Sequence, residues 1–247
     1  MENSMQLNKT TIIIPARYAS TRLEGKPLLK AKNKPIIQWV YEKASQSKLA
    51  SDVIVATDDQ RIFDAVKAFG GKVCMTSTSH KCGSDRLVEV LNKYLDIKIA
   101  VNVQGDEPMI EPESIDSAIK VLTDDNAADI STLIRVIYDE NEITNPNVVK
   151  AVKDNNGFAM YFSRSPIPYE RNKNQATTYA HIGLYVYKRE ALLKMSKLSQ
   201  SDLEKAESLE QLRALQNGLK IKTAIVNYKP VGIDTKEDFE EFLRMIN

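Results

Sequence analysis

Three apolar runs in the first half of the chain constrain the fold more than any other feature. They are TIII at 11–14, DVIVAT at 52–57 and IAVNV at 99–103. None of them alternates with polar residues, which is typical of strands buried on both faces. Helical patterns lie between the runs, at 35–45 and from Thr57 to Ala68, where Thr57 and Gln60 have capping-box spacing. This alternation predicts an α/β fold with a mainly parallel sheet and right-handed crossovers.

The second half has fewer crossover helices. Strand-like segments follow one another there with polar linkers, at 130–137, 148–153, 158–163 and 181–187. This spacing favours antiparallel or mixed pairing. One amphipathic helix is predicted over 203–215. We therefore expect a single domain over residues 1–247, with an excursion at about 130–190.

Composition excludes several classes of protein. The 34 basic and 33 acidic residues give a net charge of +1, which does not suit a polyanion-binding surface. No run approaches 18 apolar residues, and the start MENSMQLNK lacks the apolar core of a signal peptide. The two cysteines, Cys74 and Cys82, are too few and wrongly spaced for a structural zinc site, and the two histidines are too few for a histidine-rich metal centre. We expect a soluble, cytoplasmic protein without disulfides.

A cationic loop follows the first predicted strand, which Pro15 is expected to end. Arg17, Arg22 and Lys26 lie within ten residues, with Gly25 beside the lysine. This loop leaves the carboxyl end of a parallel strand, where open α/β sheets bind ligands. The Walker and G-x-G-x-x-G spacings are absent, so side chains rather than glycine backbone would bind phosphates. A solvated basic loop is the alternative.

Two aspartates are candidates for a metal site. Asp106 follows the strand at 99–103 and Gly105, and Asp234 precedes a predicted helix cap at Thr235, with Asp238 at capping-box spacing. One or two carboxylates together with substrate phosphates suffice for Mg²⁺. The alternative is that each aspartate is only a turn or cap residue.

Eight motifs occur in a set order: TIIIPARYASTRLEGKPL, VIVATDD, HKCGSDR, VNVQGDEP, MYFSRSPIPY, HIGLYVY, LEQLRAL and GIDTKEDF. In them the chain resembles the 3-deoxy-manno-octulosonate cytidylyltransferases, or CMP-Kdo synthetases, over nearly its whole length. The resemblance implies a Rossmann-like, GT-A-like nucleotidyltransferase fold, a three-layer sandwich with a mixed, mainly parallel sheet. It also implies that a smaller antiparallel region, the excursion at about 130–190, carries sugar binding and dimerisation. It implies a homodimer that transfers CMP from CTP to the anomeric hydroxyl of Kdo for lipopolysaccharide synthesis, with Mg²⁺ as cofactor.

The resemblance also implies roles for particular residues. The residues implied to bind the nucleotide are Ala16, Arg17, Ser20, Arg22, Lys26, His80, Ser84, Arg86 and Gln104. The residues implied to bind the sugar are Gln104, Arg164, His181, Tyr185, Glu210 and Gln211. Asp106 and Asp234 would hold Mg²⁺, and together with Arg17 and Lys26 they would form the catalytic group.

Three positions depart from the family pattern, and three rival functions stay open. Glu24 stands where proline is usual, and Cys82 and Ser84 stand in place of the usual SGT. The nearest rival is the same chemistry on 8-amino-Kdo or a nonulosonic acid. A GT-A glycosyltransferase would be expected to carry D-x-D where this chain has Gln104-Gly105-Asp106. A non-catalytic nucleotide-binding module is the third.

Overall fold

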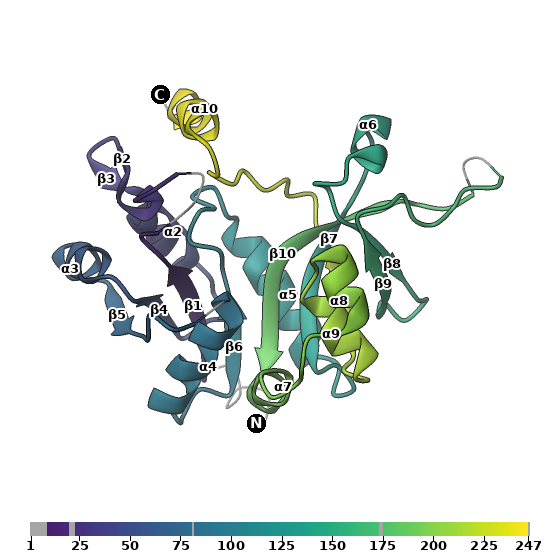
Figure 1. Ribbon diagram of the computed structural model, residues 1–247, viewed down its shortest axis with the longest axis horizontal. Coiled ribbons are helices and arrows are strands. Elements are labelled where there is room, and N and C mark those ends of the chain that lie inside the picture. Colours follow the sequence, from purple (N-terminus) through teal and green to yellow (C-terminus); the bar gives the residue numbers. More distant parts are fainter. Residues whose placement is uncertain (1–8, 20–22, 81, 173–174, 247) are drawn as a thin grey trace. The chain divides into compact units, whose positions relative to one another are not determined.

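The structure is a computed structural model that describes residues 9–19, 23–80, 82–172 and 175–246. The chain divides into two compact units (Figure 1). The first unit comprises residues 1–116 and 230–247, and the second comprises residues 117–229. The single domain over residues 1–247 expected from the sequence stays a prediction.

The first unit is built on a parallel sheet. Its strands lie in the order β6, β1, β4, β5, and β1 pairs in parallel with both β6 and β4. Their bounds are β1 (Thr10–Ala16), β4 (Asp52–Thr57), β5 (Lys72–Met75) and β6 (Ile99–Asn102). The apolar side chains of β1 and β6 are buried on both faces, which explains the uninterrupted apolar runs. The prediction of buried parallel strands is confirmed.

β1 continues through Pro15, so the prediction that this proline ends the strand is wrong. The N–H of Val103 donates to the carbonyl of Ile13 at 3.2 Å, at the end of the ladder with β6. Backbone groups of a strand alternate sides, so the N–H that Pro15 lacks would point to the same side, beyond the last ladder bond. The other side still pairs, with Ala16 opposite Thr57. Proline is therefore tolerated because no ladder bond is lost.

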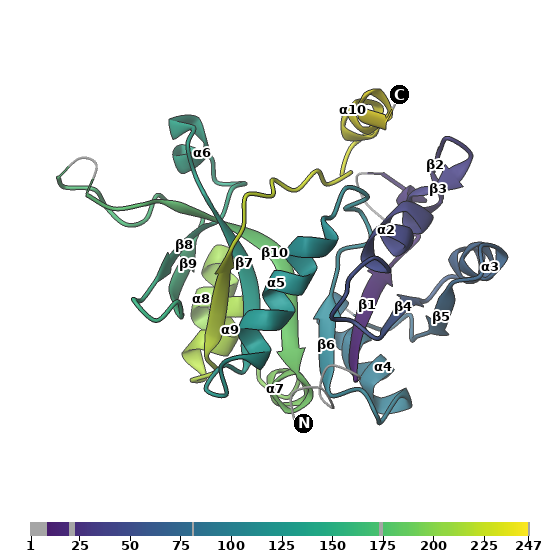
Figure 2. The same ribbon diagram turned by 180° about the vertical axis from the view of Figure 1, so that it is seen from behind.

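Helices connect these strands. α2 packs on β1 and β4, and α4 packs on β1, β4 and β6 (Figure 2). The helices and short elements of this unit are η1 (Lys26–Leu28), β2 (Lys30–Ala31), β3 (Lys34–Pro35), α2 (Ile36–Ala44), α3 (Gln60–Ala68), α4 (Gly83–Lys93) and α10 (Lys236–Ile246). α5 (Pro112–Thr123) crosses the boundary at residue 116.

The cap of α3 differs from the predicted one. The N-cap is Asp59, whose carboxylate accepts the N–H of Arg61 at 2.9 Å. Thr57 is the last residue of β4 and is fully buried, so it cannot start the helix. Its hydroxyl oxygen instead accepts the N–H of Asp59 at 3.2 Å. Thr57 therefore supports the turn that the Asp59 cap completes.

The second unit has mixed pairing, as predicted. β7 lies between β11, which is parallel to it, and β10, which is antiparallel to it. β8 pairs antiparallel with both β10 and β9. The strands are β7 (Ile130–Val136), β8 (Lys150–Lys153), β9 (Ala159–Ser163), β10 (Tyr179–Lys188) and β11 (Ile221–Ile225).

The helix expected over 203–215 is two helices. α8 (Asp202–Glu207) begins with a capping box between Ser201 and Glu204 and ends at Ser208, which adopts left-handed φ 52° and ψ 47°. α9 (Gln211–Gln216) follows the break. The remaining helices of this unit are α6 (Glu140–Thr144) and α7 (Arg189–Met195). Across the described residues, no helix combines the length and apolar character needed to span a membrane.

Candidate active site

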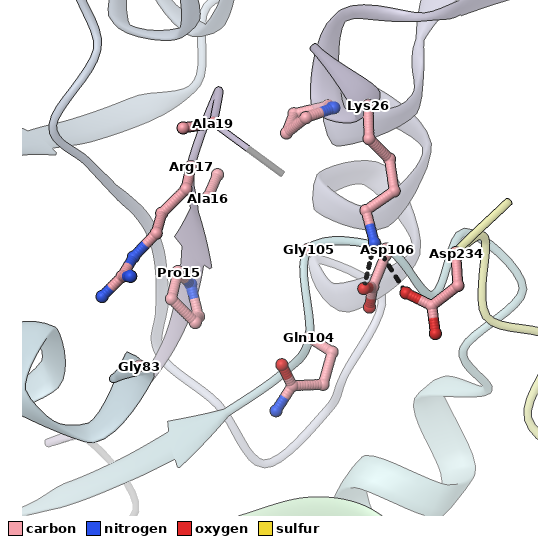
Figure 3. Close-up of a pocket in the computed structure, with 11 residues that line it drawn as sticks. Pro15, Ala16, Arg17, Ala19, Lys26, Gly83, Gln104, Gly105, Asp106 and Asp234 are labelled. Atoms are coloured by element: carbon pink, nitrogen blue, oxygen red, sulfur yellow. Dashed lines mark hydrogen bonds and ion pairs between the residues drawn. The ribbon is translucent and has the colours of Figure 1, made fainter. Parts of the chain in front are cut away.

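A pocket opens in the first unit beyond the carboxyl ends of β1 and β6 (Figure 3). Its volume of about 430 Å³ is that of a small-ligand site. The lining residues are Pro15, Ala16, Arg17, Ala19, Lys26, Pro27, Gly83, Gln104, Gly105, Asp106 and Asp234. The structure thus brings together Ala16, Arg17, Lys26, Gln104, Asp106 and Asp234 from the sequence-based set. This edge of the sheet is where open α/β folds bind ligands.

Lys26 lies between the two aspartates. Its Nζ is 2.6 Å from Asp106 Oδ2 and 3.1 Å from Asp234 Oδ1 (Figure 3). The lysine side chain is 12% exposed, whereas those of Asp106 and Asp234 are 29% and 43% exposed. Charge-assisted hydrogen bonds of this kind are short and strong. The two carboxylates therefore converge on a single cation position.

Backbone contacts hold the aspartates at this position. The N–H of Ile233 donates to the carbonyl of Asp106 at 2.9 Å, which ties the segment before α10 to the turn after β6. The carboxylate of Asp238 accepts the N–H of Asp234 at 2.9 Å and that of Thr235 at 2.8 Å, while Thr235 Oγ1 accepts the N–H of Asp238 at 3.2 Å. The predicted capping box is confirmed, and it fixes the backbone of Asp234.

The donor set fits a magnesium ion that shares its ligands with a substrate. No group of three or more His, Cys, Asp or Glu side chains suited to a metal occurs among the residues that the structure describes. Mg²⁺ does not require such a cage, because it keeps several waters and takes further oxygens from phosphates. Asp106 and Asp234 supply two hard oxygen donors that already share one cation.

Arg17 points away from the aspartates, toward the segment that precedes α4 (Figure 3). Its Nη2 donates to the carbonyl oxygens of His80 at 2.6 Å and of Cys82 at 3.4 Å. The guanidinium therefore fixes the backbone at the entrance to α4 and still lines the pocket. Its contact with nucleotide phosphates stays a prediction.

Glu89, a residue of α4, holds the same segment. Its carboxylate accepts hydrogen bonds from the backbone N–H of Ser77 at 2.8 Å and pairs with His80 Nε2 at 2.5 Å and Lys93 Nζ at 2.8 Å. Burial by itself would raise the pKa of Glu89, but the hydrogen bonds from Lys93, Ser77 and His80 outweigh it and lower that pKa to about 2. Glu89 is thus ionised at neutral pH and anchors the loop that Arg17 contacts.

The start of α4 supplies one pocket residue that the sequence-based set omitted, Gly83. Cys82 is the N-cap, and its Sγ lies 3.0 Å from Ser84 Oγ. Arg86 does not line the pocket: it is fully buried and donates to Thr76 Oγ1 at 2.5 Å and Asp58 Oδ2 at 2.8 Å. The nucleotide contacts of His80, Ser84 and Arg86 stay predictions. Ser20 and Arg22 lie outside the described residues.

The residues predicted to bind sugar belong to the second unit, apart from Gln104. Arg164 Nε donates to the carbonyl of Glu207 at 2.7 Å, and its Nη1 donates to the carbonyl of Pro146 at 2.9 Å. The Glu207 carboxylate accepts the hydroxyl of Ser163 at 2.6 Å and the N–H of Arg164 at 2.9 Å. Arg164 thereby caps a carbonyl at the end of α8, where helical partners are missing. The sequence did not indicate Glu207 as part of this cluster.

His181 is held in one tautomer. Its Nε2 lies 2.9 Å from Thr132 Oγ1, and that hydroxyl donates its single hydrogen toward the carbonyl of Leu184 at 2.7 Å. Thr132 must then accept a hydrogen from His181 Nε2, which leaves Nδ1 as an acceptor. The ring lies 4.9 Å from Phe162 and 5.3 Å from Tyr185 between centroids. Desolvation in this setting lowers the pKa of His181 to about 3, so the imidazole is neutral.

Tyr185, Glu210 and Gln211 complete the set. Burial, aided by the negative charge of Glu210, raises the pKa of Tyr185 well above its ordinary value, so the phenol stays protonated. Glu210 Oε1 lies 3.6 Å from Arg213 Nη2. Gln211 is buried, and its Nε2 has no hydrogen-bond partner among the described residues. A buried donor without a partner is costly, which is consistent with a ligand contact.

Comparison with known proteins identifies the family. A family model described as cytidylyltransferase matches residues 11–221. The chain belongs to this cytidylyltransferase family. A relative named 3-deoxy-manno-octulosonate cytidylyltransferase from Geotalea uraniireducens (strain Rf4) is 49% identical, with 96% of this chain and 99% of the relative covered. One of the same name from Fusobacterium nucleatum subsp. nucleatum is 46% identical, with 95% of each covered.

Two solved structures agree with the fold. A structure of CMP:2-keto-3-deoxy-manno-octonic acid synthetase complexed with CTP is 46% identical and has a TM-score of 0.92, covering 96% of this chain and 98% of that one. A 4-diphosphocytidyl-2C-methyl-D-erythritol synthase from Anaerococcus prevotii has a TM-score of 0.63 at 16% identity, which shows the fold alone. The predicted α/β nucleotidyltransferase fold and the family resemblance are confirmed.

Replacing Gly105 should damage the site. A Cβ at Gly105 would lie 2.7 Å from the carbonyl oxygen of Pro15, so either the end of β1 or the turn that carries Asp106 must shift. We expect Gly105→Ala to lower the rate of cytidylyl transfer by on the order of 10²-fold, because misplacement of about 1 Å has that effect. Gly232→Ala is the matched control: its Cβ would meet nothing within 4 Å, and it precedes Asp234 by two residues. Equal losses in both variants would contradict the steric account.

His181 should make stability depend on pH. Its folded pKa of about 3 lies below the unfolded value of 6.5, so only the unfolded chain gains a proton between those values. The stability from this residue is present above pH 6.5 and is lost as the pH falls toward 3. Relative to His181→Gln, we expect the wild type to lose about 2 kcal/mol between pH 7 and 5 in denaturant unfolding. Parallel pH curves for the two proteins would disprove it.

Proposed function

We propose that this protein transfers CMP from CTP to the anomeric hydroxyl of 3-deoxy-D-manno-octulosonate (Kdo), with release of pyrophosphate and formation of CMP-Kdo. The observation that carries the proposal is the convergence of Lys26, Asp106 and Asp234 in a pocket at the carboxyl edge of the sheet. Family membership supports the same reaction, because relatives 46–49% identical over nearly the whole chain bear the cytidylyltransferase name. We expect the reaction to require Mg²⁺ and to supply lipopolysaccharide synthesis in the cytoplasm, in a homodimer.

The residues of the pocket would act mainly by position and charge. Lys26 supplies a mobile ammonium for the triphosphate, and Arg17 holds the segment before α4 against the same pocket. Asp106 and Asp234 would hold the magnesium ion. When bound, this ion would polarise a phosphoryl oxygen and lower the pKa of the attacking hydroxyl. The ionisable side chains among the described pocket residues are already assigned to the triphosphate, the metal and the segment before α4, so we assign no dedicated general base.

Recognition of Kdo is assigned to the residues of the second unit. Kdo is an acid, and Arg164 carries a guanidinium that suits a carboxylate. The acceptor at His181 Nδ1, the protonated phenol of Tyr185 and the unpartnered Nε2 of Gln211 suit sugar hydroxyls. Glu210 adds an acceptor in the same cluster. A neutral His181 favours binding over proton transfer, because its low pKa makes it a poor base at neutral pH.

The substrates are tested by pyrophosphate release. Purified protein is incubated with Mg²⁺, each of the four nucleoside triphosphates in turn, and Kdo, 8-amino-Kdo or N-acetylneuraminate. We expect release with CTP and Kdo that EDTA abolishes, because removing the metal removes the charge that opposes the developing negative charge on phosphate. Release only with another acid would show that Kdo is the wrong acceptor and that the roles assigned to the sugar-binding residues are wrong. Absence of release with every pair would overturn the proposal.

The two aspartates should each be essential. Asp106→Asn and Asp234→Asn keep the shape of the side chain but remove a charged oxygen donor, so we expect each to lower turnover by on the order of 10²-fold or more. Circular dichroism should show an intact fold. Asp52→Asn is a control, since Asp52 also pairs with a lysine at 2.6 Å but does not line the pocket. Substantial magnesium-dependent turnover in either site variant would remove that aspartate from the mechanism.

A further inference from the structure

The shared cation position between Asp106 and Asp234 is filled by Lys26. The Nζ atom lies within hydrogen-bond distance of one oxygen from each carboxylate, at 2.6 Å and 3.1 Å. A metal ion held by the same two oxygens would need this position, and like charges so close repel strongly in a partly buried site. We infer that Lys26 keeps Mg²⁺ out of the two-aspartate site until a nucleotide triphosphate draws the ammonium away. This inference rests on the proposed magnesium-dependent function.

Only the side chain of Lys26 is free to make this exchange. Its backbone is fixed in η1, because the N–H of Leu28 donates to Gly25 at 2.8 Å and that of Leu29 donates to Lys26 at 3.2 Å. Pro27, the next residue, is buried. The N–H of Gly25 also donates to the carbonyl of Tyr18 at 2.9 Å, which closes the base of the loop. The four-carbon stem of lysine can change rotamer without moving the backbone.

Lys26 is also the cationic side chain best placed to bind a triphosphate. Among the described residues that line the pocket, the cationic side chains are Lys26 and Arg17. The Nη2 of Arg17 already donates to two backbone carbonyls. If Arg17 moved toward the triphosphate, these carbonyls would lose that donor. Lys26 would leave two carboxylates instead, and these can be satisfied at once by the metal ion that accompanies the nucleotide. The exchange therefore conserves charge pairing at every position.

This exchange couples the two ligands. The triphosphate removes the ammonium that competes with the metal, so nucleotide and metal should each favour the binding of the other by the same factor. A divalent ion alone must instead displace Lys26 without offering it a new partner. We therefore expect the protein without nucleotide to bind metal weakly, and the metal to enter the site with or after CTP.

Metal binding without nucleotide tests the inference directly. Mn²⁺ binding is measured by electron paramagnetic resonance for the wild type, Lys26→Met and Lys72→Met. The control is matched, because Lys72 also pairs with an aspartate of the first unit at 2.6 Å but lies outside the pocket. We expect Lys26→Met to bind one Mn²⁺ about tenfold or more tightly than the wild type, and Lys72→Met to match the wild type. Adding Asp106→Asn to Lys26→Met should abolish the gain.

A second measurement follows the ammonium itself. In EDTA, calorimetric titration with CTP should show about tenfold weaker binding to Lys26→Met than to the wild type or Lys72→Met, because the triphosphate loses its cation. Equal Mn²⁺ affinity in the wild type and Lys26→Met would overturn the inference, and so would absence of Mn²⁺ binding in both. Neither result touches the proposed reaction, because release of pyrophosphate by the wild type from CTP and Kdo decides that separately.

Discussion

In the first unit, the sheet edge formed by the carboxyl ends of the strands depends on one balance of charges, between a lysine and two aspartates. The ammonium of Lys26 joins two carboxylates that lie 80 and 208 residues away in the sequence, so a single cation links the beginning, middle and end of the chain. Exposed ion pairs contribute little to stability, and Asp234 is well exposed, so the balance matters less for folding than for the site. Two carboxylates aimed at one position repel unless a cation stands there. The position between the two carboxylates therefore always requires a positive charge. We propose that either the ammonium of Lys26 or a magnesium ion supplies it.

Much of this edge could be predicted from local pattern alone. Strands buried on both faces leave uninterrupted apolar runs, and the residues directly after such runs must meet at one edge of a parallel sheet. That geometry indicates that the loop carrying Lys26 and the turn carrying Asp106 lie at the same edge. Asp234 directly follows no strand, and its segment is held there by the hydrogen bond from Ile233 to Asp106. The capping box at Thr235 was predictable for the same reason, because its two partners lie three residues apart and need no help from the rest of the chain.

Features set by distant neighbours could not be predicted in this way. Pro15 stays in β1 because β6 has already ended beside it, and Thr57 loses the cap to Asp59 because β4 buries it. The helix expected over 203–215 breaks at Ser208, where a non-glycine residue takes the left-handed conformation. The break is held by the contact from Arg164 to the carbonyl of Glu207, a partner 43 residues away. Periodicity within the segment carries no trace of that contact.

The arginines show a further limit and a division of labour. Arg17 and Arg164 carry the charge expected of anion-binding residues, yet both donate hydrogen bonds to backbone carbonyls. Arg86 is buried and donates to Thr76 and Asp58. A planar guanidinium with five donors can hold protein groups and keep others for a ligand, whereas a lysine has a single compact charge on a flexible stem. Arginine therefore suits the fixed parts of the site, and lysine suits the part that must change partner. A chain with a net charge of +1 can thus contain an anion-binding site without a basic surface. Its cationic side chains pair with protein acceptors until oxygen atoms of the substrate take the place of those acceptors.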